Sequence, residues 1–112
     1  MSAINGRRKA ITARCGKCRR EIITGPDANV AGINADADID PISRTGELWA
    51  VVEGRRTYEL DTAGRLHHRT AKAVIFGGVG IFSTLHPAHR CAPVPATWLA
   101  PPKDRPAAVE WC

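Results

Sequence analysis

Two short stretches decide how this chain folds: Cys15-Gly16-Lys17-Cys18 near its start and His86-Pro87-Ala88-His89-Arg90-Cys91 toward its end. Together they supply three thiols and two imidazoles, and four such ligands complete one tetrahedral zinc site. A C-x-x-C turn brings both of its sulfurs to one side. On an extended strand, His89 and Cys91 would point to the same face. We therefore predict a structural Zn²⁺ ion bound by Cys15, Cys18, His89 and Cys91, with His86 as the reserve ligand.

Two other readings of the cysteines remain open at this point. Cys15 and Cys18 could form a redox pair, although the sequence lacks the βαβ context in which that motif usually sits. The four cysteines, Cys112 included, could also form two disulfides. In the zinc reading all four positions are taken by protein ligands, so the site would be structural and not catalytic.

The basic residues are concentrated at the start of the chain. The net charge is +5 over 112 residues, yet the first twenty residues contain seven basic side chains and no acidic one. Basic residues next to a zinc knuckle bind nucleic-acid phosphates without regard to base sequence. We predict this as the function. The candidate residues are Arg7, Arg8, Lys9, Arg14, Lys17, Arg19 and Arg20.

A protein partner is the alternative. Trp98 and Trp111 lie in a proline-rich tail, and exposed tryptophans are frequent anchors of protein interfaces. The protein would then be an adaptor, or a phage-type inhibitor of a host protein, unless Trp98 folds back to cap the core. No assembled acid, base or nucleophile is evident around His67, His68 or elsewhere, so we expect no enzyme activity.

The charge and proline patterns divide the chain into three parts. We predict a flexible basic arm at 1–13, a zinc-stapled domain at 14–91 and an extended Pro/Trp-rich tail at 92–112. The first twenty residues lack the apolar stretch of a signal peptide, so a reducing cytoplasm is the expected location. The longest apolar run, 73–85, is interrupted by glycines and too short to span a membrane.

Local patterns predict an α+β domain with an antiparallel sheet and one short helix. A helix is expected from about 46 to 53, because Ser43 or Thr45 can cap it and Gly54 can end it. Alternation and a glycine-containing loop predict a β-hairpin over 57–69. A short strand is expected at 21–24, and the most buried strands at 73–76 and 81–85. Residues 28–40 fit helix and irregular strand equally well.

The order of several short motifs resembles a group of small uncharacterised proteins from actinobacteria and their phages. After the C-x-x-C come Ile23-Thr24-Gly25-x-Asp27, Gly46-Glu47 and Gly54-Arg55-x-Thr57-Tyr58, with His89-Arg90-Cys91 last. Such proteins pair an early C-x-x-C with a terminal H-x-C. The resemblance implies that His89 is the ligand in preference to His86, and it implies no particular activity.

Overall fold

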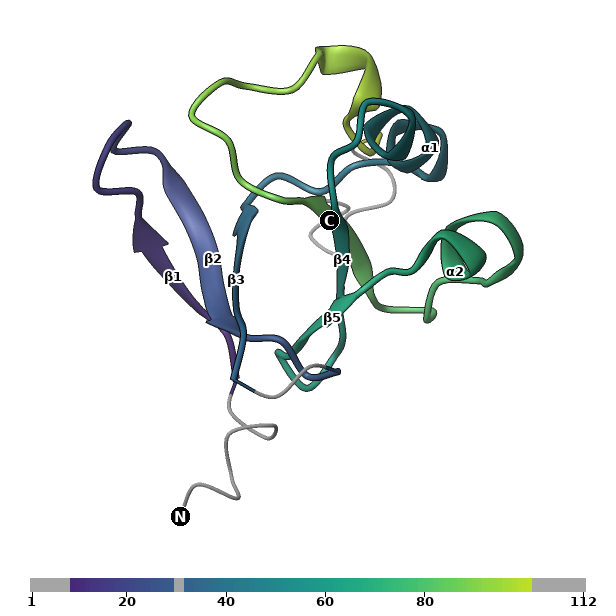
Figure 1. The fold of residues 1–112 in the computed structure, drawn as a ribbon, viewed down its shortest axis with the longest axis horizontal. Coiled ribbons are helices and arrows are strands. Elements are labelled where there is room, and N and C mark those ends of the chain that lie inside the picture. The colour runs from purple at the N-terminus through teal and green to yellow at the C-terminus, as the bar shows by residue number, and fades with distance from the viewer. Residues whose placement is uncertain (1–8, 30–31, 102–112) are drawn as a thin grey trace, which may run out of the picture.

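Two antiparallel three-stranded sheets face each other in the computed structural model, which describes residues 9–29 and 32–101. The first sheet has the order β1-β2-β3, from strands Ile11–Arg14, Glu21–Pro26 and Asn34–Asp38. The second has the order β5-β4-β6, from strands Leu66–His68, Thr57–Leu60 and Thr84–Pro87. Figure 1 shows the first sheet on one side of the molecule and both helices on the other. The α+β prediction with antiparallel sheets is confirmed.

Isolated bridges and small side chains connect the two sheets. Ala37 of β3 pairs with Ala88 just after β6, and Asp27 pairs with Leu66 at the other end. Ala35 and Ala37 are fully buried together with Ile23, Tyr58 and Leu66. Alanine at these positions lets the backbones of the two sheets come close, which brings the end of β6 against β3.

Helix α1 (Arg44–Val52) confirms the predicted helix but begins two residues earlier than the predicted start at about 46. The hydroxyl of Ser43 accepts a hydrogen bond from the amide of Gly46 at 2.9 Å, and Gly54 follows the helix with φ 79°. Gly46 is required because a Cβ there would overlap with the backbone of Trp98. The hairpin is also confirmed, with β4 and β5 paired from Tyr58↔His68 to Leu60↔Leu66.

Two strands were predicted wrongly. Residues 73–76 lie in a second helix, α2 (Ala71–Phe76), in which Thr70 caps the amide of Ala73. Phe76 is 81% exposed. The last strand starts at Thr84, and Ile81 and Phe82 before it are 89% and 81% exposed. The glycines at 77–80 separate these residues from the sheet. The prediction from local hydrophobicity therefore placed exposed residues in the core.

Part of the predicted arm and part of the predicted tail lie among the described residues and have regular structure. Ile11–Arg14 form β1, so the boundary predicted at residue 13 falls inside a strand. In the tail, Ala96–Trp98 form a 3-10 helix, η2, and Trp98 is only 5% exposed against Ile42, Ala50 and Leu85. A tail with no packed structure is therefore the wrong description of this stretch. In the described part of the chain no helix has the length and apolar character to cross a membrane.

Candidate metal centre

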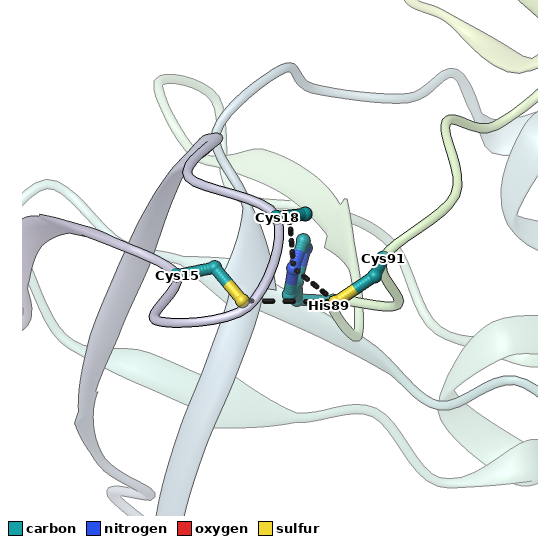
Figure 2. A group of neighbouring side chains, drawn as sticks. All are labelled: Cys15, Cys18, His89 and Cys91. Atoms are coloured by element: carbon teal, nitrogen blue, oxygen red, sulfur yellow. Dashed lines mark hydrogen bonds between the residues drawn. The ribbon is translucent and has the colours of Figure 1, made fainter.

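The first two candidate ligands lie in the tight turn between β1 and β2. The Cys15 carbonyl accepts from the Arg19 amide and the Cys15 amide donates to the Arg20 carbonyl, both at 2.9 Å. The amide of Lys17 donates to the Cys15 sulfur at 3.4 Å. Arg19 takes a left-handed conformation with φ 65°, which closes the turn. The turn directs both sulfurs to one side, as the spacing predicted (Figure 2).

The other two candidate ligands follow β6 on an irregular stretch and not on a strand. The amide of Ala88 donates to the Arg56 carbonyl and that of His89 to the Asp36 carbonyl, each at 2.8 Å. These bonds hold the stretch between the two sheets, opposite the turn. The imidazole of His89 and the thiol of Cys91 both face the sulfurs of the turn (Figure 2).

The four ligand atoms have the spacing of a tetrahedral zinc site. All lie within 4.8 Å of one another. Cys15 Sγ is 3.7 Å from Cys91 Sγ, and His89 Nε2 is 3.4 Å from Cys18 Sγ and 3.8 Å from Cys91 Sγ. Zinc bonds of about 2.3 Å to sulfur and 2.0–2.1 Å to nitrogen give edges of roughly 3.8 Å between sulfurs and roughly 3.6 Å between sulfur and nitrogen. The three contacts match these edges, and the widest separation, up to 4.8 Å, would have to shorten by about 1 Å for all four residues to hold one zinc ion.

Asp38 orients the histidine for this role. Its Oδ1 lies 2.7 Å from His89 Nδ1, which donates the hydrogen bond and leaves Nε2 as the ligand atom. The other oxygen of Asp38 accepts from Arg55 at 3.2 Å, and Arg55 also donates to the Ala88 carbonyl at 2.7 Å. A carboxylate behind a zinc-binding imidazole is a recurrent arrangement in zinc sites. The sequence analysis missed Asp38 and Arg55, since their pairing joins distant segments.

The pKa values of Cys15 and Cys91 are shifted in opposite directions. Hydrogen bonds from the amides of Cys18 and Lys17 lower the pKa of Cys15 to about 6. Side-chain hydrogen bonds with Cys15 and Cys18 raise the pKa of Cys91 to about 11, and the negative charge of those sulfurs adds to the rise. Burial lowers the pKa of His89, but hydrogen bonds to Asp38, Cys15 and Cys18 together outweigh it and the net shift is upward. A divalent cation relieves this crowding.

His86 is not a ligand in this arrangement. Its ring is buried, with Nδ1 2.8 Å from the Asp38 carbonyl and Nε2 2.7 Å from the Thr84 hydroxyl. Burial lowers the pKa of His86, which keeps the ring neutral. Its two nitrogens are both hydrogen-bonded, so it supports the fold. His67 and His68 lie in β5, as the sequence analysis expected.

The candidate nucleic-acid residues separate into three groups. Arg14, Lys17 and Arg19 are exposed in the turn or on β1 beside it, and Arg20 is half-buried. Lys9 lies instead at the far end of β1, against Gly64, so it is not part of this surface. Arg7 and Arg8 lie outside the described residues. Arg90, exposed between the two later ligands, belongs to the surface but was missed, because the sequence analysis considered only the N-terminal basic residues.

The two candidate interface tryptophans do not form a surface in the described part of the chain. Trp98 is buried against α1, so the prediction of an exposed anchor there is wrong and the capping alternative describes it. Its neighbours on α1, η2 and β6 cover the indole. Trp111 lies outside the described residues.

A second buried charge cluster lies under α1. Glu47, fully buried, accepts from Arg69 Nε at 3.0 Å and Nη2 at 2.9 Å and from the Thr57 hydroxyl at 2.7 Å. Arg69 also donates to the carbonyls of Gly78 and Ala73, and the bonds to Glu47 raise its pKa. This cluster connects α1, β4 and the α2 loop, and it has no ligand atoms directed toward a free site.

Comparisons of the chain with protein-family models, with curated proteins and with solved structures give no match. Function is therefore argued from the geometry and the charges of the chain itself.

Proposed function

We propose that this chain is a non-enzymatic zinc protein that binds nucleic acid through phosphate contacts made around its metal centre. The observation that carries the proposal is the position of three exposed cations. Lys17 and Arg19 lie in or beside the first ligand pair, and Arg90 lies between the last two ligands. A zinc ion closing this site would therefore bring cations from both ends of the chain onto one surface.

The formal charges on and around the metal centre predict a positive electrostatic potential at this surface. Zn²⁺ with three thiolates and a neutral imidazole leaves a single negative charge. Arg14 at the end of β1 and Arg20 in the loop before β2 add to the three exposed cations, so the basic residues outnumber that charge. Asp38, the nearest buried carboxylate, is already paired with Arg55. Four protein ligands leave no open coordination position, which favours a structural and not a catalytic ion.

The composition favours contact with phosphates over recognition of bases. The first aromatic residue in the sequence is Trp49, so no ring accompanies the cations of the turn to stack on nucleobases. No helix carries these cations either, since Lys17, Arg19 and Arg90 all lie in loops. Binding through such contacts is independent of sequence and strongly dependent on salt.

Fluorescence anisotropy with duplex and single-stranded probes of mixed sequence tests this proposal. With roughly three to four phosphates neutralised, the logarithm of the affinity should fall against the logarithm of salt with a slope of about −3 on duplex DNA. The variant R90E should weaken binding and flatten the slope. K72E is the matched control, because Lys72 is exposed on α2, across the molecule from the turn (Figure 1). Binding that salt leaves unchanged, or an equal loss in K72E, would refute the proposal.

A protein partner is the second candidate. The observation that favours it is the exposure of apolar side chains on the helical side: Trp49 is 56%, Phe76 81% and Phe82 81% exposed. Interface centres are enriched in aromatic residues. Trp98, which is buried, is not one of them. A partner isolated by affinity capture would be tested against two variants. Loss of partner binding on removal of residues 102–112 would assign binding to the tail, and loss on replacement of Phe76 with Ser would assign it to the helices.

We also infer that the protein works in a reducing cytoplasm, where zinc-bound thiolates persist. The relationship to small actinobacterial and phage proteins belongs to the same proposal and is supported by the order of motifs. Several of those motif residues have structural roles here. Gly46 packs on Trp98, Glu47 bonds to Thr57, and Arg55 bonds to Asp38.

A further inference from the structure

The close contacts among the four candidate ligand atoms include one between two sulfurs. Cys15 Sγ and Cys91 Sγ are 3.7 Å apart, while His89 Nε2 lies 3.4 Å from Cys18 Sγ and 3.8 Å from Cys91 Sγ. The sulfur pair contains the most accessible sulfur, since Cys91 is exposed whereas Cys15, Cys18 and His89 are partly buried. The exposed side of the centre thus has two sulfurs in contact that come from opposite ends of the chain.

We propose that Cys91 and Cys15 form a peroxide-sensitive pair, whose oxidation to a disulfide releases the metal. The inference rests on the zinc centre of the proposed function and extends it to a site of reversible modification. A disulfide requires the sulfurs to approach from 3.7 Å to about 2.05 Å. Cys91 is exposed on a stretch outside the strands, so we expect side-chain rotation there to provide this movement.

The oxidant is a hydroperoxide, and the reaction has two steps. The Cys91 thiolate attacks the O–O bond, which breaks, giving a sulfenic acid on Cys91 and one hydroxide from hydrogen peroxide. The Cys15 thiolate then attacks the Cys91 sulfur, forms the S–S bond and expels a second hydroxide. Two thiolates have supplied the two electrons that reduce the peroxide. Cys18 and His89 remain as two ligands, too few for a structural zinc site.

The position of the pair determines the result of oxidation. A Cys15–Cys91 bond joins the β1–β2 turn to the stretch after β6, so the two sheets stay connected after the metal leaves. A Cys15–Cys18 bond would close only the turn and leave Cys91 free. The first product replaces the metal with a covalent link across 76 residues, and a thiol reductant restores the four ligands.

Peptide mapping of the full-length protein under non-reducing conditions tests this directly. The zinc-loaded protein is treated with hydrogen peroxide, and released zinc is measured with a chromogenic chelator. We expect the Cys15–Cys91 cross-link to appear in proportion to released zinc and both to reverse after dithiothreitol and added zinc. A Cys15–Cys18 cross-link, a link to Cys112, or zinc release without any disulfide would overturn the proposal.

Two variants sharpen the experiment. C112S should give the same cross-link, because the fourth cysteine is not part of the pair. C91S should give no cross-link to residue 15, and mapping of the unsubstituted protein decides the matter if C91S fails to fold. Metal analysis of the untreated protein separates the two proposals. A protein that never takes up zinc contradicts the proposed function, whereas a zinc protein oxidised at other sulfurs contradicts only this inference.

Discussion

The metal centre and the cluster around Glu47 are two ways of stabilising charge inside one small domain. At the metal centre, three thiols and His89 converge, and binding a metal as thiolates would place three negative charges together. Beneath α1, the carboxylate of Glu47 is matched by the guanidinium of Arg69 at 2.9 Å. On the zinc proposal the first region needs an ion from solution, whereas the second carries its own counter-charge. The two regions should respond differently to changes in solution conditions.

The largest effect should follow removal of the metal. Structural zinc contributes on the order of 10 kcal/mol to small zinc peptides, so chelation should open the β1–β2 turn and the stretch after β6. Hydrogen exchange followed by mass spectrometry should show the greatest loss of protection in residues 11–26 and 88–91. The amides of α1 and β4 should lose less protection from exchange. Equal loss in both regions, or none, would contradict the distinction between them.

The next largest effect tests the second region. The change E47Q removes the closer carboxylate from buried Arg69 and leaves the carbonyls and Glu59, 3.5 Å away, so the cost should be at most about 3–5 kcal/mol, the cost of fully broken buried pairs. Urea unfolding of the zinc-saturated protein measures the loss. E53Q is the matched control, because Glu53 is exposed at the end of the same helix. Zinc stoichiometry should stay unchanged, and similar stability of the two variants would show that the pair contributes little.

A smaller effect concerns the residue that positions His89. The change D38N should weaken zinc affinity by about 10–100-fold, the usual effect of losing a carboxylate behind a histidine ligand. Competition with a chelator of known affinity measures it. D36N serves as the control, since Asp36 is exposed and bonds to Thr24. If both variants bind zinc equally well, Asp38 does not tune the site.

The smallest effect concerns Asp61 at the surface of the β4–β5 hairpin. Burial alone would raise its pKa, but hydrogen bonds from the Arg65 amide and from His67 lower it overall. A lowered folded-state pKa stabilises the fold above the ordinary carboxyl pKa, and this contribution disappears as pH falls through the folded value. D61N should therefore cost about 1 kcal/mol at neutral pH and progressively less toward acid. Thermal unfolding from neutral to acidic pH measures the difference, and a constant difference would contradict it.

The comparison also explains what the sequence could and could not predict. The turn at Cys15–Cys18, the helix after Ser43 and the β4–β5 hairpin all depend on neighbouring residues, and all three were predicted. Residues 73–76 were misassigned because a short apolar run looks the same in a buried strand and in an exposed helix. The cap at Thr70 was the signal that could have distinguished them.

The site was predictable only to the level of its ligands. Cysteine and histidine at metal-binding spacing identified the four ligands that the structure brings together. The pairs Asp38–Arg55 and Glu47–Arg69 were missed, because an ion pair between distant segments leaves no periodic pattern. Burial of Trp98 was foreseen only as the alternative to an exposed anchor, for a related reason. The space it fills is created by Gly46, whose role becomes visible only when η2 packs on α1.

The separation of the two ligand pairs along the chain also affects how the protein is made. Cys18 and His89 are 71 residues apart. At a synthesis rate of roughly 5–20 residues per second, the second ligand pair is synthesised roughly 4–14 s after the first ligand pair. During that interval Cys15 and Cys18 form only half of a site. If the site binds zinc as proposed, metal loading is one of the last events in the synthesis of this protein, completed after β6 has been made.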